Sequence, residues 1–481
     1  MPVLPQRRAF QAPDREFSLT PSRSGMCKPI GMNPTWLAYA ARAVPRYTSY
    51  PTAADFSPAT GADEARQWAG AAAPGEAISA YLHIPFCETL CWYCGCATSV
   101  PNGYRRVGEY TARLTAEIDL WARALGPHGG IGHLHFGGGS PNALSSEDFA
   151  ALVAAMRVSF GIRPDAEIAV ELDPRTMHDG QVEAFAEAGV TRVSLGVQTL
   201  APAVQAAVNR IQPPDMVAGL VADLRRNGIG AINMDLMYGL PHQTTEDVAG
   251  AARFAAEAGA ARISVFGYAH VPWFAKHQKA IDEAALPDLA LRLEQAEAAA
   301  ATLKQMGYLP IGLDHYARED DTLAQAWLEG RLRRNFQGYT DDPCETLVGI
   351  GATSISQFRE GFVQNLKDRR AWGEAVAAGR LPVERGIMLT NEDRLRACAI
   401  ERLMCWMSVD VDDVCHEFGV PPGSLDDAVA RARTLETAGL CRIRGARITV
   451  PDEARLFLRT VAQCFDARTP AAPQQRHAKA V

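Results

Sequence analysis

Four cysteines lie close together in the stretch YLHIPFCETLCWYCGC, residues 81–96. Cys87, Cys91 and Cys94 form the spacing C-x3-C-x2-C, and Cys96 follows one residue later, after a glycine. Thiolates are the soft ligands of iron–sulfur clusters, and three of them so close together can bind three corners of a cubic cluster. The fourth iron would have no protein ligand. The spacing therefore predicts a cluster with an open coordination position, where metal chemistry can take place.

A zinc knuckle and a disulfide are the two other structures that these cysteines could form. Structural zinc usually takes two C-x2-4-C pairs, and no second pair follows the first in this chain. Disulfides are typical of secreted proteins, and nothing in the sequence marks the chain as secreted. The spacing favours the iron–sulfur cluster over both alternatives.

The composition excludes several broad classes of protein. Among 481 residues, 47% are hydrophobic and 21% are charged, so a large core can form. A net charge of −7 argues against a nucleic-acid surface built on overall basicity. No apolar run approaches the ~18 residues of a membrane-spanning helix, and no signal peptide is recognisable. Eleven cysteines, an odd and mostly scattered set, favour a reducing cytoplasm.

A strand–helix pattern repeats through the first two thirds of the chain. Short apolar strands are predicted at 78–86, 131–138, 167–173, 191–198, 231–238 and 262–269. Amphipathic helices are predicted between them; in 145–160, one face carries Phe149, Leu152, Val153, Met156 and Phe160. Six successive βα units predict an α/β fold with a parallel sheet and helices outside it.

Chemistry in such folds is found at the carboxyl ends of the strands. The residues that end the six units are, in chain order, the cysteine loop, Gly137–Pro141, Glu171–Pro174, Gln198, Asp235 and Tyr268–His270. Each unit thus ends in glycine, carboxylate, amide or other polar groups where apolar residues would otherwise stop. The glycine run predicts close backbone approach to a ligand, with exposed N–H groups that bind its carboxylate; a tight turn is the alternative.

The pattern Y-x-H-I-P-F-C-x3-C-x2-C-G-C, read from Tyr81 to Cys96, resembles a known family. It is similar to the oxygen-independent coproporphyrinogen III oxidases (dehydrogenases) of the radical S-adenosylmethionine (SAM) superfamily. The segments 45–56, 312–317 and 333–340 are also similar, so the resemblance covers about residues 45–466. It implies an open, partial six-unit βα barrel of the radical SAM type, followed by a smaller and mainly helical domain.

The resemblance also implies a reaction. Two propionate side chains of coproporphyrinogen III would lose carbon dioxide without oxygen and become vinyl groups, giving protoporphyrinogen IX in porphyrin and heme biosynthesis. No ordinary side-chain base removes a proton from such an unactivated carbon, so the hard step falls to cofactors. The family uses one 4Fe–4S cluster, two SAM molecules and a 5′-deoxyadenosyl radical. It is expected to need an electron donor such as flavodoxin or ferredoxin, an electron acceptor that the sequence does not name, and to be monomeric.

Site residues follow from the resemblance, position by position. The implied cluster ligands are Cys87, Cys91 and Cys94, and the implied catalytic residues are Cys96 and His83. The implied contacts of the first SAM are Tyr81, Gly138, Glu171 and Ile355. Those of the second are Tyr93, Gly139, Ser140, Gln198, Arg210, Asp235 and Ala269.

Structural alternatives stand beside several of these roles. Glu171 and Asp235 lie in apolar strands, where a carboxylate needs a partner and a structural ion pair is the rival interpretation. Gln198 and Arg210 could be helix-start or surface groups. His83, Ile355 and Ala269 would be core residues on composition alone. Four arginines near matched segments are candidate partners for the propionates: Arg46, Arg175, Arg334 and Arg385.

Two other functions compete with the oxidase. Relatives with the same barrel act as heme chaperones that bind heme without oxidase turnover; they lack a cysteine at the position of Cys96 and the segment PRYTSYPT, and this chain has both. A zinc-structured interaction protein is the third possibility, and it predicts a colourless protein.

The expected domain organisation has four parts. Residues 1–44 are predicted to be a disordered extension, and 45–380 the barrel with a lid segment at its start. Residues 381–468 are predicted to be a helical, winged-helix-like domain, because 441–450 reads as two short strands around a glycine turn. Residues 469–481 are predicted to be a frayed tail.

Overall fold

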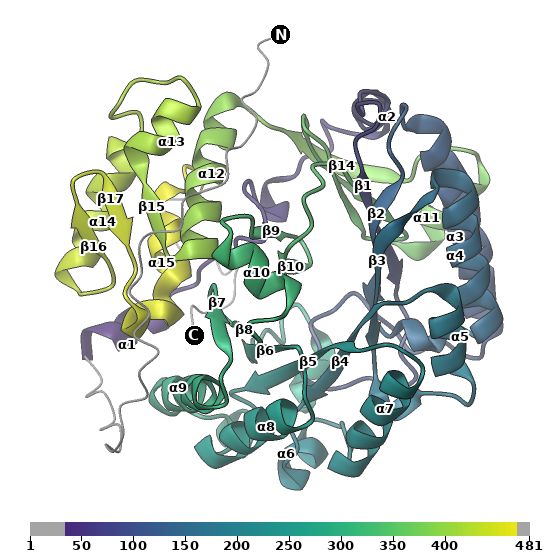
Figure 1. Cartoon of the computed structure of the whole chain (residues 1–481), viewed down its shortest axis with the longest axis horizontal. Coiled ribbons are helices and arrows are strands. Elements are labelled where there is room, and N and C mark those ends of the chain that lie inside the picture. The colour runs from purple at the N-terminus through teal and green to yellow at the C-terminus, as the bar shows by residue number, and fades with distance from the viewer. Residues whose placement is uncertain (1–33, 469–481) are drawn as a thin grey trace. The chain divides into compact units, whose positions relative to one another are not determined.

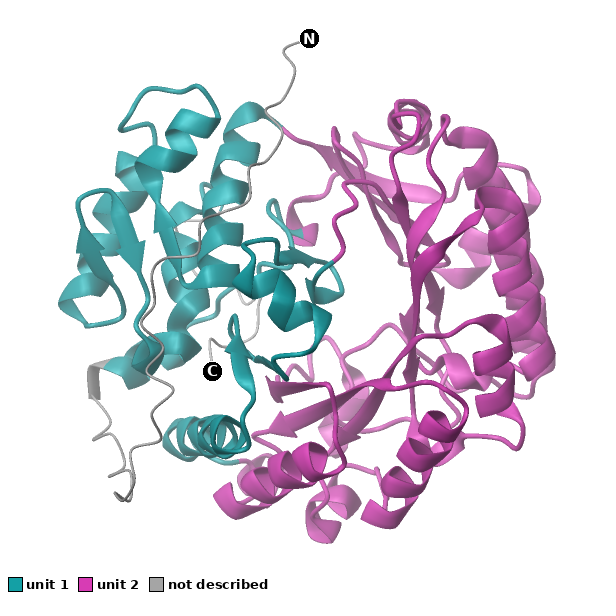
Figure 2. Ribbon diagram, in the orientation of Figure 1, with its two compact units in different colours: residues 1–52, 287–341, 390–481 teal, residues 53–286, 342–389 magenta. Residues whose placement is uncertain are grey.

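The computed structural model describes residues 34–468, and these divide into two compact units (Figure 2). Unit 2 comprises Ala53–Leu286 and Asp342–Leu389. Unit 1 comprises, within the described residues, 34–52, 287–341 and 390–468. The expected extension before residue 34 and the expected tail, 469–481, lie outside the described residues.

A parallel sheet forms the centre of unit 2. Its first six strands are β1 (Ile78–Ile84), β2 (Ile131–Gly138), β3 (Ile162–Leu172), β4 (Arg192–Gln198), β5 (Ala231–Tyr238) and β6 (Arg262–Gly267). They pair side by side in chain order, each parallel to the next. This confirms the six predicted strands, with bounds shifted by a few residues.

Four later strands extend the sheet beyond β1. They are β11 (Leu347–Ile350), β12 (Ile355–Gln357), β13 (Gly361–Asn365) and β14 (Val383–Met388). β11 pairs with β1 in parallel, and the other three follow in antiparallel order. Unit 2 is therefore an α/β unit built on an open sheet of βα repeats, as the sequence predicted.

Helices cover the outer side of this sheet (Figure 1). They are α3 (Arg105–Ala124), α4 (Ser146–Phe160), α5 (Gln181–Ala188), α7 (Pro214–Arg226) and α8 (Thr245–Glu257). The five apolar residues predicted for one face of 145–160 are all buried in α4. Ser145 caps this helix by accepting a hydrogen bond from the Asp148 N–H. Shorter helices in unit 2 are α2 (Ala62–Gly70), α6 (Pro202–Ala207) and α11 (Arg369–Ala377).

A buried carboxylate joins α3 to the later strands of unit 2. The Glu117 side chain accepts four hydrogen bonds: from Gly351 N (2.8 Å), Asn365 Nδ2 (2.6 Å), Trp372 Nε1 (2.9 Å) and Trp121 Nε1 (3.2 Å). Burial raises the pKa of Glu117 to about 7, and the four donors oppose that shift. With two donors on each oxygen, the acceptor capacity of the carboxylate is well used, as a buried charge requires.

Unit 1 combines a first set of elements with the end of the chain. The first set is α1 (Pro34–Ala40), α9 (Leu289–Gln305), β7 (Leu309–Ile311), β8 (His315–Ala317), α10 (Thr322–Leu328), β9 (Arg333–Asn335) and β10 (Gly338–Thr340). The second is α12 (Asn391–Trp406), β15 (Ser408–Asp410), α13 (Val411–Glu417), α14 (Asp426–Thr437), β16 (Arg442–Arg444), β17 (Arg447–Thr449) and α15 (Leu458–Ala462). Strands β16 and β17 form the hairpin predicted around Gly445, and β15 pairs with β17.

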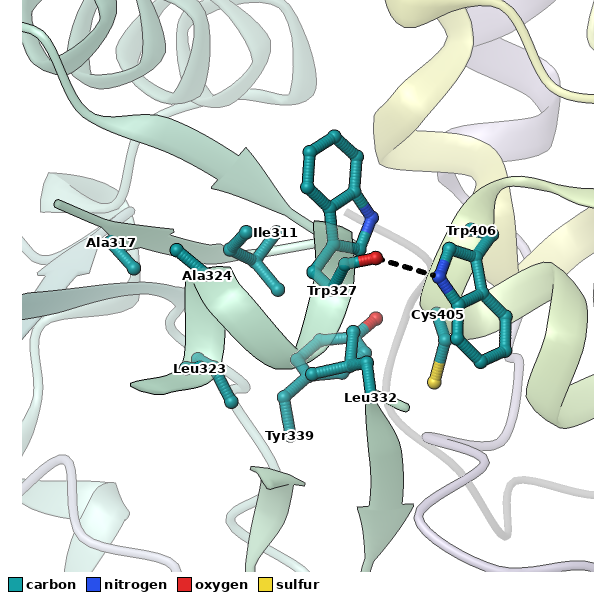
Figure 3. Close-up of a cluster of buried hydrophobic side chains, with 9 residues drawn as sticks. All are labelled: Ile311, Ala317, Leu323, Ala324, Trp327, Leu332, Tyr339, Cys405 and Trp406. Carbon is teal, nitrogen blue, oxygen red and sulfur yellow. Dashed lines mark hydrogen bonds between the residues drawn. The ribbon is translucent and has the colours of Figure 1, made fainter. Parts of the chain in front are cut away.

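Two features of unit 1 differ from the expected organisation. Helix α1 forms at Pro34–Ala40, within the extension for which disorder was predicted. Residues 287–341 group with the end of the chain rather than with the barrel. A shared apolar cluster explains the grouping: Trp327 and Tyr339 pack with Cys405 and Trp406, and the Trp406 indole donates to the Trp327 carbonyl at 3.3 Å (Figure 3). Contacts distant in sequence, which periodicity does not reveal, decide this boundary.

No helix among residues 34–468 is both long enough and apolar enough to cross a membrane.

Candidate functional site

The cysteine loop follows β1 directly and is closed by backbone hydrogen bonds at its base. The Cys87 N–H donates to the Ser99 carbonyl at 3.1 Å, and the Ser99 N–H donates to the Pro85 carbonyl at 3.1 Å. Within the loop, the Cys94 N–H donates to the Cys91 carbonyl at 3.1 Å. The three cysteines of the predicted motif are thus presented from one short closed loop at the carboxyl end of the first strand.

Each cysteine sulfur of the motif has a hydrogen-bonding neighbour. Cys87 Sγ lies 3.1 Å from Thr98 Oγ1, and burial raises the pKa of Cys87 to about 11. Cys94 Sγ accepts a hydrogen bond from the Cys96 N–H at 3.4 Å. Hydrogen bonds from Cys96 lower the pKa of Cys94 to about 6. Cys96 itself is exposed.

Cys91 lies in a buried set of charged groups. Arg175 Nη2 and Arg210 Nη1 reach its sulfur at 3.2 and 3.3 Å. Both guanidinium groups also pair with the Asp173 carboxylate, at 2.6 Å from Arg175 and 3.2 Å from Arg210. The exposed fractions of the three charged side chains are 7% for Asp173, 10% for Arg175 and 7% for Arg210. Desolvation raises the pKa of Asp173, but the two arginines outweigh it and the net pKa shift is downward.

A second polar group forms on β1, β2 and β3. The register places Tyr81 opposite His135, and their rings stack at 5.7 Å between centroids. His135 Nε2 donates to Glu171 Oε1 at 3.0 Å, and the Gly138 N–H donates to Glu171 Oε2 at 3.2 Å. Desolvation raises the pKa of Glu171, but His135 and Gly138 hold it below its ordinary value.

His83 is bonded at both ring nitrogens. Its Nε2 lies 3.1 Å from the Ala97 carbonyl, so this nitrogen must donate. Its Nδ1 lies 3.1 Å from the Tyr81 hydroxyl, which then donates to it. Burial lowers the pKa of His83, which favours this neutral ring. His83 therefore ties the strand that carries Tyr81 to the end of the cysteine loop.

The N–H groups of Gly138, Gly139 and Ser140, which the sequence predicted to be exposed for a ligand, are bonded within the protein. The Gly138 N–H donates to Glu171, the Gly139 N–H to the Ile84 carbonyl (2.8 Å) and the Ser140 N–H to the Phe86 carbonyl (2.7 Å). A Cβ on Gly138, which has φ +111°, would lie 2.4 Å from the His83 ring. One on Gly139 would lie 2.4 Å from the Phe86 carbonyl oxygen. The glycines are needed because β1 and the cysteine loop lie close to them.

Gln198 ends β4 in an unusual conformation. Its φ is +63°, and the pairing of β4 with β5 shifts register between Gly196 and Gln198. Such an irregularity re-aims a side chain at the end of a strand. Gln198 Oε1 and Arg210 Nε are both buried and have no hydrogen-bond partner. The Gln198 acceptor lies at the end of β4, and the Arg210 donor belongs to the guanidinium group that contacts Cys91. Both atoms could form a hydrogen bond with a ligand.

Asp235 lies among neutral polar groups. The Ser194 hydroxyl donates to its Oδ2 at 2.8 Å, and Asn233 Nδ2 donates to its Oδ1 at 2.9 Å. Burial, which the Glu171 charge reinforces, raises the pKa of Asp235. Asp235 thus has hydrogen bonds from neutral groups in place of the structural ion pair considered for it, and Glu171 accepts a hydrogen bond from His135.

The buried Gln278 side chain brings two other predicted residues together. Its Nε2 donates to the Tyr93 carbonyl at 2.9 Å and to the Ala269 carbonyl at 3.2 Å. The neighbouring His277 Nε2 lies 2.6 Å from the Cys94 carbonyl. The segment after β6 therefore braces the cysteine loop. Ile355 lies at the start of β12, away from Gln278. Its backbone is close to Gly349, since a Cβ on Gly349 would lie 2.5 Å from the Ile355 carbonyl oxygen. Gly349 in turn pairs with Tyr81 in the sheet.

Several residues of these groups were not predicted as site residues, among them His135, Asp173 and Gln278. His135 could have been found, because strand alternation places it on the same face of β2 as Gly137 at the strand end. The register between β1 and β2 then places it opposite Tyr81. Asp173 was noted only as part of a strand end, and Gln278 follows a loop whose course the sequence does not reveal. Asp173 and Gln278 depend on contacts between distant segments.

The candidate arginines differ in how far their donors are used. Arg175 is committed to Asp173 and Cys91, and Arg385 Nε and Nη2 both bond Gln364 Oε1, at 2.9 and 2.8 Å. Arg46 is exposed. Arg334, in unit 1, stacks over the Tyr339 ring and has a buried Nη1 without a partner.

The cysteine loop fits an iron–sulfur cluster in its chemistry. It offers three thiol groups with N–H or O–H neighbours, and hydrogen bonds to sulfur are a known influence on such clusters. Among the described residues, no group of three or more His, Cys, Asp or Glu side chains converges on a point where one metal ion could sit. A cubic cluster binds each thiolate to a different iron, so its ligands do not converge in this way.

Comparison with known proteins extends these observations to most of the chain. Residues 81–255 match the family model of the radical SAM superfamily. An oxygen-independent coproporphyrinogen III oxidase of Bradyrhizobium diazoefficiens is 45% identical, over 92% of this chain and 99% of that protein. One from Pseudomonas aeruginosa is 34% identical, over 91% of this chain and 96% of its own length.

A solved structure leads to the same family. It is coproporphyrinogen III oxidase (HemN) from Escherichia coli, described as a radical SAM enzyme. The match has a TM-score of 0.84 at 36% identity and covers 88% of this chain and 98% of that one. With the cysteine loop and the six βα units in place, these matches show that the chain belongs to the oxygen-independent coproporphyrinogen III oxidase family of radical SAM enzymes.

Proposed function

We propose that this chain oxidatively decarboxylates two propionate side chains of coproporphyrinogen III to vinyl groups and gives protoporphyrinogen IX without oxygen. The observation that carries the proposal is the closed loop with Cys87, Cys91 and Cys94 at the end of β1, in a chain that matches oxidases over nearly its full length. When bound, a 4Fe–4S cluster and SAM would supply the radical that takes a hydrogen atom from the substrate.

The residues of the chain would hold these groups in place. Cys87, Cys91 and Cys94 are the proposed cluster ligands. Tyr81, Gly138, Glu171 and Ile355 are the proposed contacts of the first SAM. The shared hydrogen bonds of Glu171 with His135 and Gly138 support this role, because they keep the carboxylate ionised and fixed in orientation. Cys96 is exposed beside Cys94, which suits a catalytic role.

A second SAM molecule is part of the same proposal. Its proposed contacts are Tyr93, Gly139, Ser140, Gln198, Arg210, Asp235 and Ala269. The unpartnered buried atoms Gln198 Oε1 and Arg210 Nε support it, because buried polar atoms without partners are rare and call for an explanation. Equilibrium binding on the cluster-loaded protein should give two SAM per chain in wild type and one in Gln198→Ala. One SAM per chain in both proteins would contradict the second site.

The electron donor, the oligomeric state and the cellular location of the chain are also proposed. A low-potential one-electron protein such as flavodoxin or ferredoxin is the proposed electron donor, and the chain is proposed to act as a monomer in a reducing cytoplasm. Sedimentation of the cluster-loaded protein tests the monomer.

Turnover under strict anaerobiosis tests the proposed function. The cluster is reconstituted, and SAM, a strong reductant, an electron acceptor and coproporphyrinogen III are added. Protoporphyrinogen IX and 5′-deoxyadenosine should form together in wild type, and neither should form in Cys87→Ala. Heme binding without SAM cleavage, despite an intact cluster, would instead favour the heme chaperone function.

A further inference from the structure

Arg175 contacts the sulfur of Cys91, although it is not one of the proposed SAM contacts. It comes from the short segment after β3, and its guanidinium donates in three directions. Nε and Nη2 bond the Asp173 carboxylate, Nη1 donates to the Asn209 carbonyl at 3.1 Å, and Nη2 reaches Cys91 Sγ at 3.2 Å. A side chain that is nine-tenths buried is thus fixed with one N–H directed at a cysteine sulfur.

Arg210 repeats this arrangement from another part of the chain. Its Nη1 lies 3.3 Å from Cys91 Sγ and 3.2 Å from Asp173 Oδ2, while its Nη2 donates to the Gly196 carbonyl. Asp173 therefore holds two guanidinium groups on the same sulfur. Its own backbone is fixed in turn, since its N–H donates to Asn142 Oδ1 at 3.1 Å and its carbonyl accepts from Asn142 Nδ2 at 3.1 Å.

The two guanidinium groups and the Asp173 carboxylate leave a net positive charge beside the Cys91 sulfur. Two arginines contribute two positive charges and Asp173 contributes one negative charge. Both guanidinium groups donate to the Cys91 sulfur, so this buried positive charge lies at the position of the proposed cluster. Additional negative charge on a cluster bound there would be stabilised by the same two groups.

We propose that Arg175 is a positioning residue for Cys91 that, together with Arg210, raises the reduction potential of the cluster, while the Asp173 carboxylate holds both guanidinium groups in place and partly offsets their charge. The inference rests on the proposed cluster at Cys87, Cys91 and Cys94. Reduction adds one electron to the cluster and therefore one negative charge. N–H groups and positive charge close to a cluster sulfur stabilise that reduced state more than the oxidised state.

The proposal predicts potential shifts of opposite sign for two neighbouring substitutions. Arg175→Gln removes a positive charge and should disfavour the reduced cluster about tenfold, which is about 59 mV toward lower potential for a one-electron couple. Asp173→Asn removes the negative charge that offsets the arginines and should move the potential upward. Arg175→Lys keeps the charge but loses the two-pronged fork, so its potential should lie between those of wild type and Arg175→Gln.

Arg163 provides a matched control. It also forms a two-pronged pair with an aspartate two residues further on, Asp165, at 3.0 and 3.3 Å, but its pair is exposed. Arg163→Gln removes the same kind of pair from the start of β3 and should leave the potential unchanged.

The measurement is a potentiometric titration of the reconstituted protein with dithionite, followed by electron paramagnetic resonance and by iron and sulfide content. A wild-type protein that binds no cluster would contradict the proposed function itself. A loaded Arg175→Gln protein with the potential of wild type and of Arg163→Gln would overturn this inference alone. If Arg175→Gln does not load, Asp173→Asn decides: a higher potential supports the inference, and an unchanged or lower one overturns it.

Discussion

Two buried carboxylates of unit 2, Glu117 and Asp173, show how structure and chemistry differ in the same fold. Glu117 accepts hydrogen bonds from two indoles, an amide and a backbone N–H, all of them neutral donors. Asp173 pairs with two charged guanidinium groups, and each of these also reaches the Cys91 sulfur. Both carboxylates are satisfied, so burial alone does not distinguish them.

What distinguishes the two is what lies beyond the first partner. Around Glu117 the network closes on itself and joins α3 to the later strands. Around Asp173 it continues to a sulfur at one end and to the unpartnered Arg210 Nε at the other. A polar network that ends in an unused donor and a reactive atom indicates a functional site. A network whose donors and acceptors are all paired with one another indicates a structural role.

Removal of the Cys91 sulfur should have the largest effect on the candidate site. Cys91→Ser should lose the cluster and all SAM cleavage, because a hydroxyl does not replace a thiolate ligand of iron. Iron content and 5′-deoxyadenosine formation measure both effects. Substitution of Cys398, a buried cysteine of α12 in unit 1, by serine is the control and should retain both. A Cys91→Ser protein with wild-type iron content would contradict the assignment of Cys91.

Cys96, the exposed cysteine that follows the motif, should be needed for oxidase turnover but not for cluster binding. Cys96→Ser should keep a cluster and its SAM cleavage but lose oxidase activity, since Cys96 lies outside the three-ligand motif. The comparison is made by iron content and product formation in the same preparation. A fully active Cys96→Ser enzyme would remove the reason for treating Cys96 as catalytic.

Glu117 should behave as a purely structural carboxylate. Glu117→Gln places an amide N–H₂ group among four donors and should lower the free energy of unfolding by about 3 kcal/mol. Urea unfolding measures the loss. Glu109→Gln, which removes an exposed carboxylate of the same helix paired with Arg105, should change stability by less than about 0.5 kcal/mol. Equal effects of the two substitutions would show that the Glu117 network contributes little.

Substitution of His135 should have the smallest effect on the candidate site, a weaker binding of the first SAM. His135→Gln removes the partner that holds Glu171 Oε1 and should weaken binding of the first SAM about tenfold, the range expected of a hydrogen bond to a charged group. Equilibrium binding of SAM to the cluster-loaded protein measures this. His133→Gln, two residues earlier on β2 and paired with Asp342 instead, is the control and should bind SAM as wild type does. Similar weakening in both would assign the effect to the strand rather than to Glu171.

The sequence predicted the frame of the molecule better than the details of the site. All six strands were predicted because their apolar runs are short and end in glycine or polar residues, and each forms in the sheet. Gly189, Gly228, Gly259 and Gly307, which follow helix ends, all have positive φ. Local pattern is enough for such features.

The site required contacts that local pattern does not contain. The glycine run indicated a ligand-binding turn, but the N–H groups of Gly138, Gly139 and Ser140 bond Glu171, Ile84 and Phe86. Arg175 was a candidate for a propionate, and the fold places it on Cys91 because β3 and the cysteine loop meet. The roles of Tyr93, Ala269 and Ile355 rested on family resemblance and stay proposals.

The central claim is that three cysteines bind a 4Fe–4S cluster and leave one iron open for SAM. Electron paramagnetic resonance of the dithionite-reduced protein, recorded with and without SAM, tests it directly. We expect the signal of a reduced 4Fe–4S cluster whose g-values change when SAM is added, in wild type and in Cys96→Ser alike. A cluster signal that SAM leaves unchanged, in a protein shown to bind SAM, would contradict the open iron and with it the proposed chemistry.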